Sequence, residues 1–226
     1  MVGKLIEYLS VFIALMIVLP VHEFAHAFVA DKYGDYTPRV NGRLTLNPIA
    51  HVDLYGLLAI VLVRFGWGKP VPVNPNNFRK YKAGCFWVSI AGVLANYLLA
   101  FLTYPLFMLV IRAIFAGIIP DVGYFDDVLL FVSLYIPSLS INFCAFNLLP
   151  LYPLDGFKIV QTFNKKRGPI YRFVRDKGQY VLLGLLLLSV IAVYTGLVYL
   201  DILGTVLGYM TDVMFYPITA FWGLIF

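Results

Sequence analysis

The sequence predicts an all-α polytopic membrane protein with five to six transmembrane helices. Of its 226 residues, 61% are hydrophobic and 13% are charged, whereas a soluble domain has about 45–50% apolar and about 25% charged residues. A spanning helix needs about 20 mostly apolar residues, and such runs lie at about 4–30, 84–116, 128–150, 178–200 and 202–226. The length predicts one membrane domain, residues 1–226, without an appended soluble module.

The first run, at about 4–30, is predicted to be a retained span and not a cleaved signal peptide. Lys4 precedes it, and Ala25-His26-Ala27 imitates a cleavage site of small residues. However, the run from Leu5 to Ala30 is longer than a signal core of about 7–15 residues. The alternative of a cleaved leader is therefore the weaker interpretation.

Two shorter features are predicted between the first and second spans. Asn41-Gly42 is a strong turn signal between extended residues, so a short membrane-associated β-hairpin is predicted at 39–46. The apolar stretch 54–65 is short and contains Gly56, which predicts a half-span or re-entrant segment. Several prolines follow and favour an extended path, so residues 31–82 are predicted to form a partly membrane-embedded cover around a site on the first span.

The distribution of charge predicts the topology. The segments 64–82 and 158–177 are rich in Lys and Arg, whereas 117–127 has neither and carries three Asp. Because positive loops stay on the cytoplasmic side, the two basic segments are predicted to face the cytoplasm. The net charge of +5 follows from this arrangement and does not indicate a nucleic-acid partner.

His22, Glu23 and His26 form an ionisable cluster in the apolar first run. Residues four apart lie on one face of a helix, so the two imidazoles can meet one metal ion. In the pattern H-E-x-x-H the histidines bind zinc and the Glu is the general base. A chance match is the alternative, but ionisable groups in a membrane span cost about 2.5–3.5 kcal/mol each. The sequence therefore predicts a Zn²⁺ site here.

A third protein ligand is expected, because catalytic zinc sites typically use three protein ligands and keep one position open. The sequence offers two candidates for it. Asp155 follows Pro150 and Pro153, which end the preceding helix at the membrane edge, the depth expected for His26. Alternatively, Asp155 only caps the helix that begins near Gly156. His51 is the other candidate ligand.

Two motifs together resemble the site-2 protease family of intramembrane zinc metalloproteases. They are His22-Glu23-x-x-His26 in the first span and Asn147-x-x-Pro150-x-x-Pro153-Leu154-Asp155-Gly156 downstream. The stretch AGVLAN at 91–96 is similar to the family's Gly-Pro-x-x-Asn segment, with Val93 in place of the proline. NPIAHVDLYG at 47–56 and GKPVPVN at 68–74 look like compact prokaryotic members without extra soluble domains. The resemblance covers the runs at 4–30, 84–116 and 128–150, which implies that these are core spans and that 178–200 and 202–226 are accessory.

The resemblance implies a function and a role for each site residue. It implies one Zn²⁺ per chain, with His22, His26 and Asp155 as ligands, Glu23 as the base and Asn147 polarising the scissile carbonyl. His51 then lies near the site without an assigned role, and Asn147 could instead only form a hydrogen bond between helices. The reaction implied is hydrolysis of transmembrane or membrane-associated proteins near the cytoplasmic side of a prokaryotic cell membrane.

A membrane transporter of metal ions or protons is the alternative function, because buried His, Glu and Asp also line ion pathways. It predicts further ionisable residues along the other spans, which have almost none at 84–116, 128–150 and 178–200. A protease must instead hold an unwound substrate. As a hypothesis, the edge of the hairpin at 39–46 could pair with a substrate strand, or the hairpin could be a plain connection.

Overall fold

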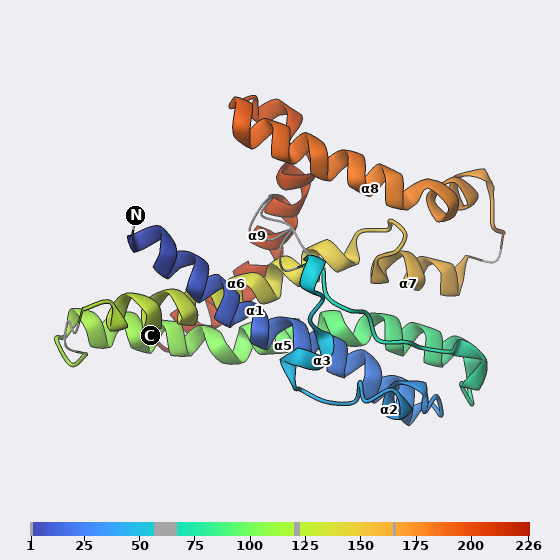
Figure 1. The fold of residues 1–226 in the computed structure, drawn as a ribbon, viewed down its shortest axis with the longest axis horizontal. Coiled ribbons are helices and arrows are strands. Elements are labelled where there is room, and N and C mark those ends of the chain that lie inside the picture. The colour runs from blue at the N-terminus through green and yellow to red at the C-terminus, as the bar shows by residue number, and fades with distance from the viewer. Residues whose placement is uncertain (1, 57–66, 120–122, 165) are drawn as a thin grey trace.

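The computed structural model describes residues 2–56, 67–119, 123–164 and 166–226, and this part of the chain is mainly α-helical (Figure 1). Its long helices confirm the predicted runs at 4–30, 84–116, 128–150 and 178–200, although the last helix begins well before residue 178. Among the described residues, four helices are long and apolar enough to cross a membrane: α1 (Val2–Lys32), α5 (Tyr81–Phe115), α6 (Phe125–Leu148) and α8 (Pro169–Thr195).

The number of candidate spans in the described chain is four, not the predicted five to six. The run at 202–226 forms helix α9 (Ile202–Gly223), but α9 does not reach the hydropathy of the other four. Tyr, Thr and Gly residues, Asp212 and Pro217 interrupt its Leu, Ile and Val residues and lower the mean. The re-entrant segment predicted at 54–65 falls mostly on residues 57–66, which lie outside the described residues.

Helices α1, α5 and α6 pack against one another and form the centre of the molecule. Small residues at helix contacts let the backbones approach closely. Those that are buried in these three helices include Ser10, Ala14, Ala27, Ala30, Ala91, Gly92, Ala100, Ser140, Cys144 and Ala145. Helix α9 packs on α5 and α6, and α8 packs on α9, so that α8 lies apart from α1 and α5 (Figure 1).

The two ends of the molecule carry different segments. The short elements α2 (Thr37–Val40), η1 (Pro75–Asn77) and α7 (Asp155–Phe163) lie toward one end, whereas α3 (Pro48–His51) lies beside the middle of α1 (Figure 1). The last turn of α5 and the first turn of α6 lie at the opposite end (Figure 1). A further short helix, η2 (Val198–Leu200), links α8 to α9. The start of α5, α7 and the start of α8, which follow or belong to the two basic segments, therefore lie toward the end opposite the first turn of α6, which carries Asp126 and Asp127 (Figure 1).

The β-hairpin predicted at 39–46 is wrong. Thr37–Val40 form helix α2, and none of the described residues forms a strand within a sheet. Asn41 has a φ of −85° and Gly42 a φ of +66°, whereas a type I′ hairpin turn needs positive φ at both central residues. Asn41-Gly42 instead ends a helix, a position where glycine with positive φ is common. The hypothesis of substrate pairing with this hairpin loses its basis.

Asp35 anchors the turn after α1 to the extended segment before α5. Its buried carboxylate accepts hydrogen bonds from the N–H and hydroxyl of Thr37, the Asn74 N–H and the Asn77 amide. Burial raises the pKa of Asp35, but these hydrogen bonds lower the pKa by more than burial raises it. The pKa of Asp35 therefore lies below its ordinary value of 3.8. The ionised carboxylate therefore joins residues 35–37 to residues 74–77.

Replacing Asp35 by Ala is expected to lower the free energy of unfolding by about 3 kcal/mol, because hydrogen bonds to a charged group contribute about 1.5–3 kcal/mol. Since the folded-state pKa is lowered, this stabilisation is present above the unfolded pKa and is lost as the pH falls through the folded one. The difference in the free energy of unfolding between wild type and variant should shrink below about pH 4. Thermal unfolding in detergent checks this, with Asp35→Asn as the milder variant; a gap that is absent or does not change with pH contradicts it.

Candidate metal centre

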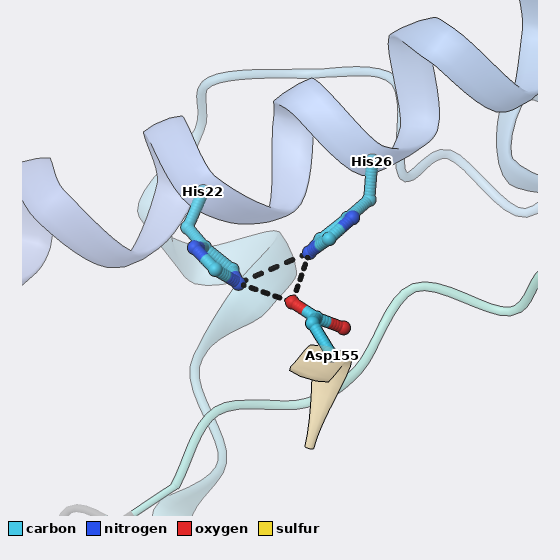
Figure 2. A group of neighbouring side chains, drawn as sticks. All are labelled: His22, His26 and Asp155. Atoms are coloured by element: carbon cyan, nitrogen blue, oxygen red, sulfur yellow. Dashed lines mark hydrogen bonds and ion pairs between the residues drawn. The ribbon is translucent and has the colours of Figure 1, made fainter. Parts of the chain in front are cut away.

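Helix α1 presents His22 and His26 on one face, one turn apart, as the spacing predicts. Both side chains are buried between α1 and the neighbouring helices, with 3% and 7% exposure. Their Nε2 atoms lie 3.0 Å apart and point to the same place (Figure 2). Two imidazoles are therefore available to one metal ion.

Asp155 is the first residue of α7 and completes a group of three. Its Oδ2 lies 3.0 Å from Nε2 of His26 and 3.3 Å from Nε2 of His22 (Figure 2). A Cβ at Gly156 would lie 2.3 Å from the carbonyl oxygen of Leu148, so only glycine lets α7 begin against the end of α6. The N-cap of α7 is Leu154, so the interpretation of Asp155 as only a helix cap is wrong.

The carboxylate of Asp155 suits a metal ligand. Lys158 donates to its Oδ1 at 2.8 Å, whereas the buried Oδ2 has no hydrogen-bond donor among the described residues besides the two imidazoles. Burial raises the pKa of Asp155, but the neighbouring imidazoles and the Lys158 ammonium hold it well below its usual range. An ionised oxygen and two imidazole nitrogens, all within 4.8 Å of one another, form a donor set that zinc accepts. The residues present thus fit a Zn²⁺ ion.

Helix α5 supports the two histidines from behind. The Val88 carbonyl lies 2.6 Å from Nδ1 of His26, and the Asn96 amide lies 3.3 Å from Nδ1 of His22. Partners of this kind orient metal-binding imidazoles. The sequence alone assigns no role to Val88 or Asn96; the one signal for Asn96 is the resemblance of 91–96 to a family segment. Val93 stands where the family segment has a proline, and helix α5 continues through this position without a break.

Gly92 leaves the space that the imidazoles occupy. A Cβ at this position would lie 2.5 Å from Cε1 of His22 and 2.5 Å from Nε2 of His26. Gly92→Ala is therefore expected to displace both rings and to lower zinc affinity at least tenfold, by the scale known for groups that orient ligands. Competition with a chelator measures this. Gly184→Ala on α8, where a Cβ meets nothing within 4 Å, is the control; equal affinity of both variants contradicts the packing described.

Glu23 and Asn147 line the same cleft as the three ligand candidates. Oε2 of Glu23 accepts a hydrogen bond from the Val71 N–H at 3.0 Å. The Asn147 amide donates to the Phe143 carbonyl at 3.1 Å, a bond within its own helix and not between helices. The structure thus brings both predicted catalytic residues to the cleft that holds the histidines.

His51, the other candidate for the third ligand, lies outside the group of His22, His26 and Asp155. It is fully buried, and its Nε2 lies 2.8 Å from the Thr45 carbonyl. Its own carbonyl accepts the Lys69 N–H at 2.7 Å. These bonds tie the loop before α3 to the extended segment, which is a structural position.

The cleft has a volume of about 1340 Å³, larger than the roughly 300–1,000 Å³ of small-molecule sites. Extended residues of the stretch 67–75 form one wall, as the prolines there predict. Apolar side chains of α1 and α6 form much of the remainder: Val11, Leu15, Met16, Leu19, Leu139, Phe143 and Phe146. The cleft therefore offers room for a peptide segment along α1.

Fold and site together define a membrane protein in which a candidate His-His-Asp metal site is buried in a large apolar cleft. Among curated proteins, the chain is 42% identical over 149 residues to "Putative zinc metalloprotease YwhC" of Bacillus subtilis, covering 66% of each. It is 29% identical over 191 residues to "Putative zinc metalloprotease Rip2" of Mycobacterium tuberculosis, covering 81% of this chain and 69% of the relative. The chain is 30% identical to "Putative zinc metalloprotease Rip2" of Mycolicibacterium smegmatis, and this match covers 67% of this chain and 58% of the relative. The chain belongs to the site-2 protease family of zinc metalloproteases, as its two motifs predict.

These matches span about two thirds of the length of the curated relatives. No family model matches the chain, and no solved structure does. The relatives do not favour the alternative of a metal-ion or proton transporter. The three donors also form one closed group on α1 and α7, not a series of sites across the bilayer as an ion pathway requires.

Proposed function

We propose that this protein is an intramembrane zinc endopeptidase. His22, His26 and Asp155 bind one Zn²⁺, Glu23 is the general base and Asn147 stabilises the oxyanion. The substrates are transmembrane or membrane-associated proteins, cut near the cytoplasmic side of a prokaryotic cell membrane. The convergence of three ligand atoms in a cleft that Glu23 also lines carries this proposal.

Glu23 performs the proton transfers. Bound zinc supplies a Lewis acid that activates water and polarises a peptide carbonyl. Among the described residues, Val71 occupies Oε2 of Glu23 while Oε1 accepts no hydrogen bond, so Oε1 is free to take the proton of the attacking water. Glu23 then returns this proton to the leaving amine.

Asn147 faces the cleft from the last turn of α6, close in sequence to Asp155. Its amide, which donates a hydrogen bond to the Phe143 carbonyl, can donate instead to the carbonyl oxygen of the substrate as negative charge develops on that oxygen. A single donor of this kind contributes about 2.7–4 kcal/mol in well-studied hydrolases. The apolar walls exclude bulk water, which strengthens this interaction.

The shape of the cleft supports a membrane-embedded substrate. Its lining on α1 extends from Val11 to His26, about 22 Å at 1.5 Å per residue. A length of peptide can therefore lie along α1 with one end in the apolar half of the span. The basic segments at the end of the molecule that carries α7 support a cytoplasmic position for that end.

Cleavage in proteoliposomes tests the proposed function. Purified protein is incorporated with a model transmembrane substrate, and product is measured with and without a zinc chelator. We expect chelator-sensitive cleavage that zinc restores, with no flux of zinc or protons across the same vesicles. Ion flux without cleavage would instead support a transporter.

A further inference from the structure

The two metal-binding histidines have different partners at Nδ1. The partner of His26 is the Val88 carbonyl at 2.6 Å, which can only accept a hydrogen bond. His26 must therefore carry its proton on Nδ1 and present an electron pair at Nε2. This is the form that a metal ion needs.

The partner of His22 is the Asn96 side chain, which is fully buried in α5. The nitrogen of its amide lies 3.3 Å from Nδ1 of His22, and its Oδ1 has no hydrogen-bond partner among the described residues. When the amide donates to Nδ1, the proton of a neutral imidazole is on Nε2. There it points toward Nε2 of His26 at 3.0 Å and Oδ2 of Asp155 at 3.3 Å, in the place of a metal ion.

We propose that Asn96 is a positioning residue that serves both tautomers of His22 and changes its hydrogen bond when metal binds. Rotation of the amide by half a turn brings Oδ1 to His22, where it accepts a proton from Nδ1 and leaves Nε2 with a free electron pair. The proton on Nε2 leaves to water and another from water binds Nδ1, so the imidazole stays neutral. This inference rests on the proposed function, because it requires zinc at Nε2.

Asn96 can change its hydrogen bond to His22 without breaking a hydrogen bond to a third residue. Oδ1 has no partner in the described part of the chain, so the rotation gives up no other hydrogen bond. An amide can donate or accept at the same point, whereas a carboxylate only accepts and an alkyl group does neither. Because Gly92, one turn earlier on α5, has no side chain, the His22 ring packs directly against the backbone of α5. This contact holds the ring in place while the Asn96 amide rotates.

Zinc affinity of three variants, measured by chelator competition in detergent, tests the proposal. Asn96→Leu keeps the shape but has no hydrogen-bonding group, and should bind zinc about 10–100-fold more weakly than wild type. Asn96→Asp can accept from Nδ1 and should recover most of that loss. Thr103→Val is the control, since the Thr103 hydroxyl on α5 binds only the Leu99 carbonyl of its own helix. Equal zinc affinity in wild type and Asn96→Leu overturns the proposal.

Nitrogen NMR of the histidine rings tests the same point in the wild-type protein, without the Asn96 variants. The chain has three histidines, so selective ¹⁵N labelling gives few signals, which His22→Ala assigns. We expect His22 to be protonated at Nε2 without metal and at Nδ1 with zinc. Protonation at Nδ1 in both states overturns the proposal, while a wild type that binds no zinc overturns the proposed function as well.

Discussion

Glu23→Gln is expected to lower the rate of substrate cleavage by about 10²–10⁴-fold, the range for a general acid–base group, without loss of zinc. The amide has nearly the same shape as the carboxylate and can still contact the Val71 N–H, but it cannot accept a proton from water. Because Glu23 is outside the group of metal-ligand candidates, the zinc content should remain one ion per chain.

Zinc content and cleavage rate are measured on the same preparations. Glu7→Gln is the matched control, because Glu7 is the other glutamate of the chain and lies near the start of α1, where it accepts from the Tyr135 hydroxyl. It should cleave at the wild-type rate. Cleavage by Glu23→Gln at that rate would exclude Glu23 as the base, and loss of zinc from this variant would mean that Glu23 is a ligand.

Asp155→Ala is expected to reduce zinc affinity more than 100-fold, beyond the effect of residues that only orient ligands, and to abolish cleavage. The change leaves two imidazoles without the ionised oxygen that lies 3.0 Å from His26. It also leaves the Lys158 ammonium without its partner, which places an unpaired positive charge beside the vacated ligand position.

Metal analysis after dialysis and the cleavage assay measure this effect. Asp176→Ala is the control, since Asp176 is exposed on α8 and pairs with Arg175; it should retain zinc and activity. Zinc that remains bound to Asp155→Ala with wild-type affinity would point to a different ligand set, in which another residue takes the third position.

The sequence predicts the long helices and the residues of the candidate metal site because each depends on a local rule. A bilayer requires about 20 apolar residues, which places α1, α5, α6 and α8. The spacing of His22 and His26 puts their rings on one face wherever a helix forms. The prolines after residue 148 end α6 and allow a new helix to begin at Asp155.

The remaining features depend on how helices pack. Val88, Gly92 and Asn96 surround the imidazoles only because α5 lies against α1, which no spacing within α5 reveals. Asn41-Gly42 is compatible with a hairpin and with a helix end, and the contacts of Asp35 with Thr37 favour the helix. The sequence of α9 looks like an apolar span, yet its Tyr, Thr and Gly residues keep its mean hydropathy below that of the four candidate spans.

X-ray absorption at the zinc edge of the purified wild-type protein tests the central claim most directly, because it identifies the atoms bound to the metal. We predict one zinc per chain with nitrogen and oxygen ligands, two of them imidazoles, and no sulfur. Absence of zinc, or a sulfur ligand such as Cys85 in the cleft wall, would contradict a site made by His22, His26 and Asp155.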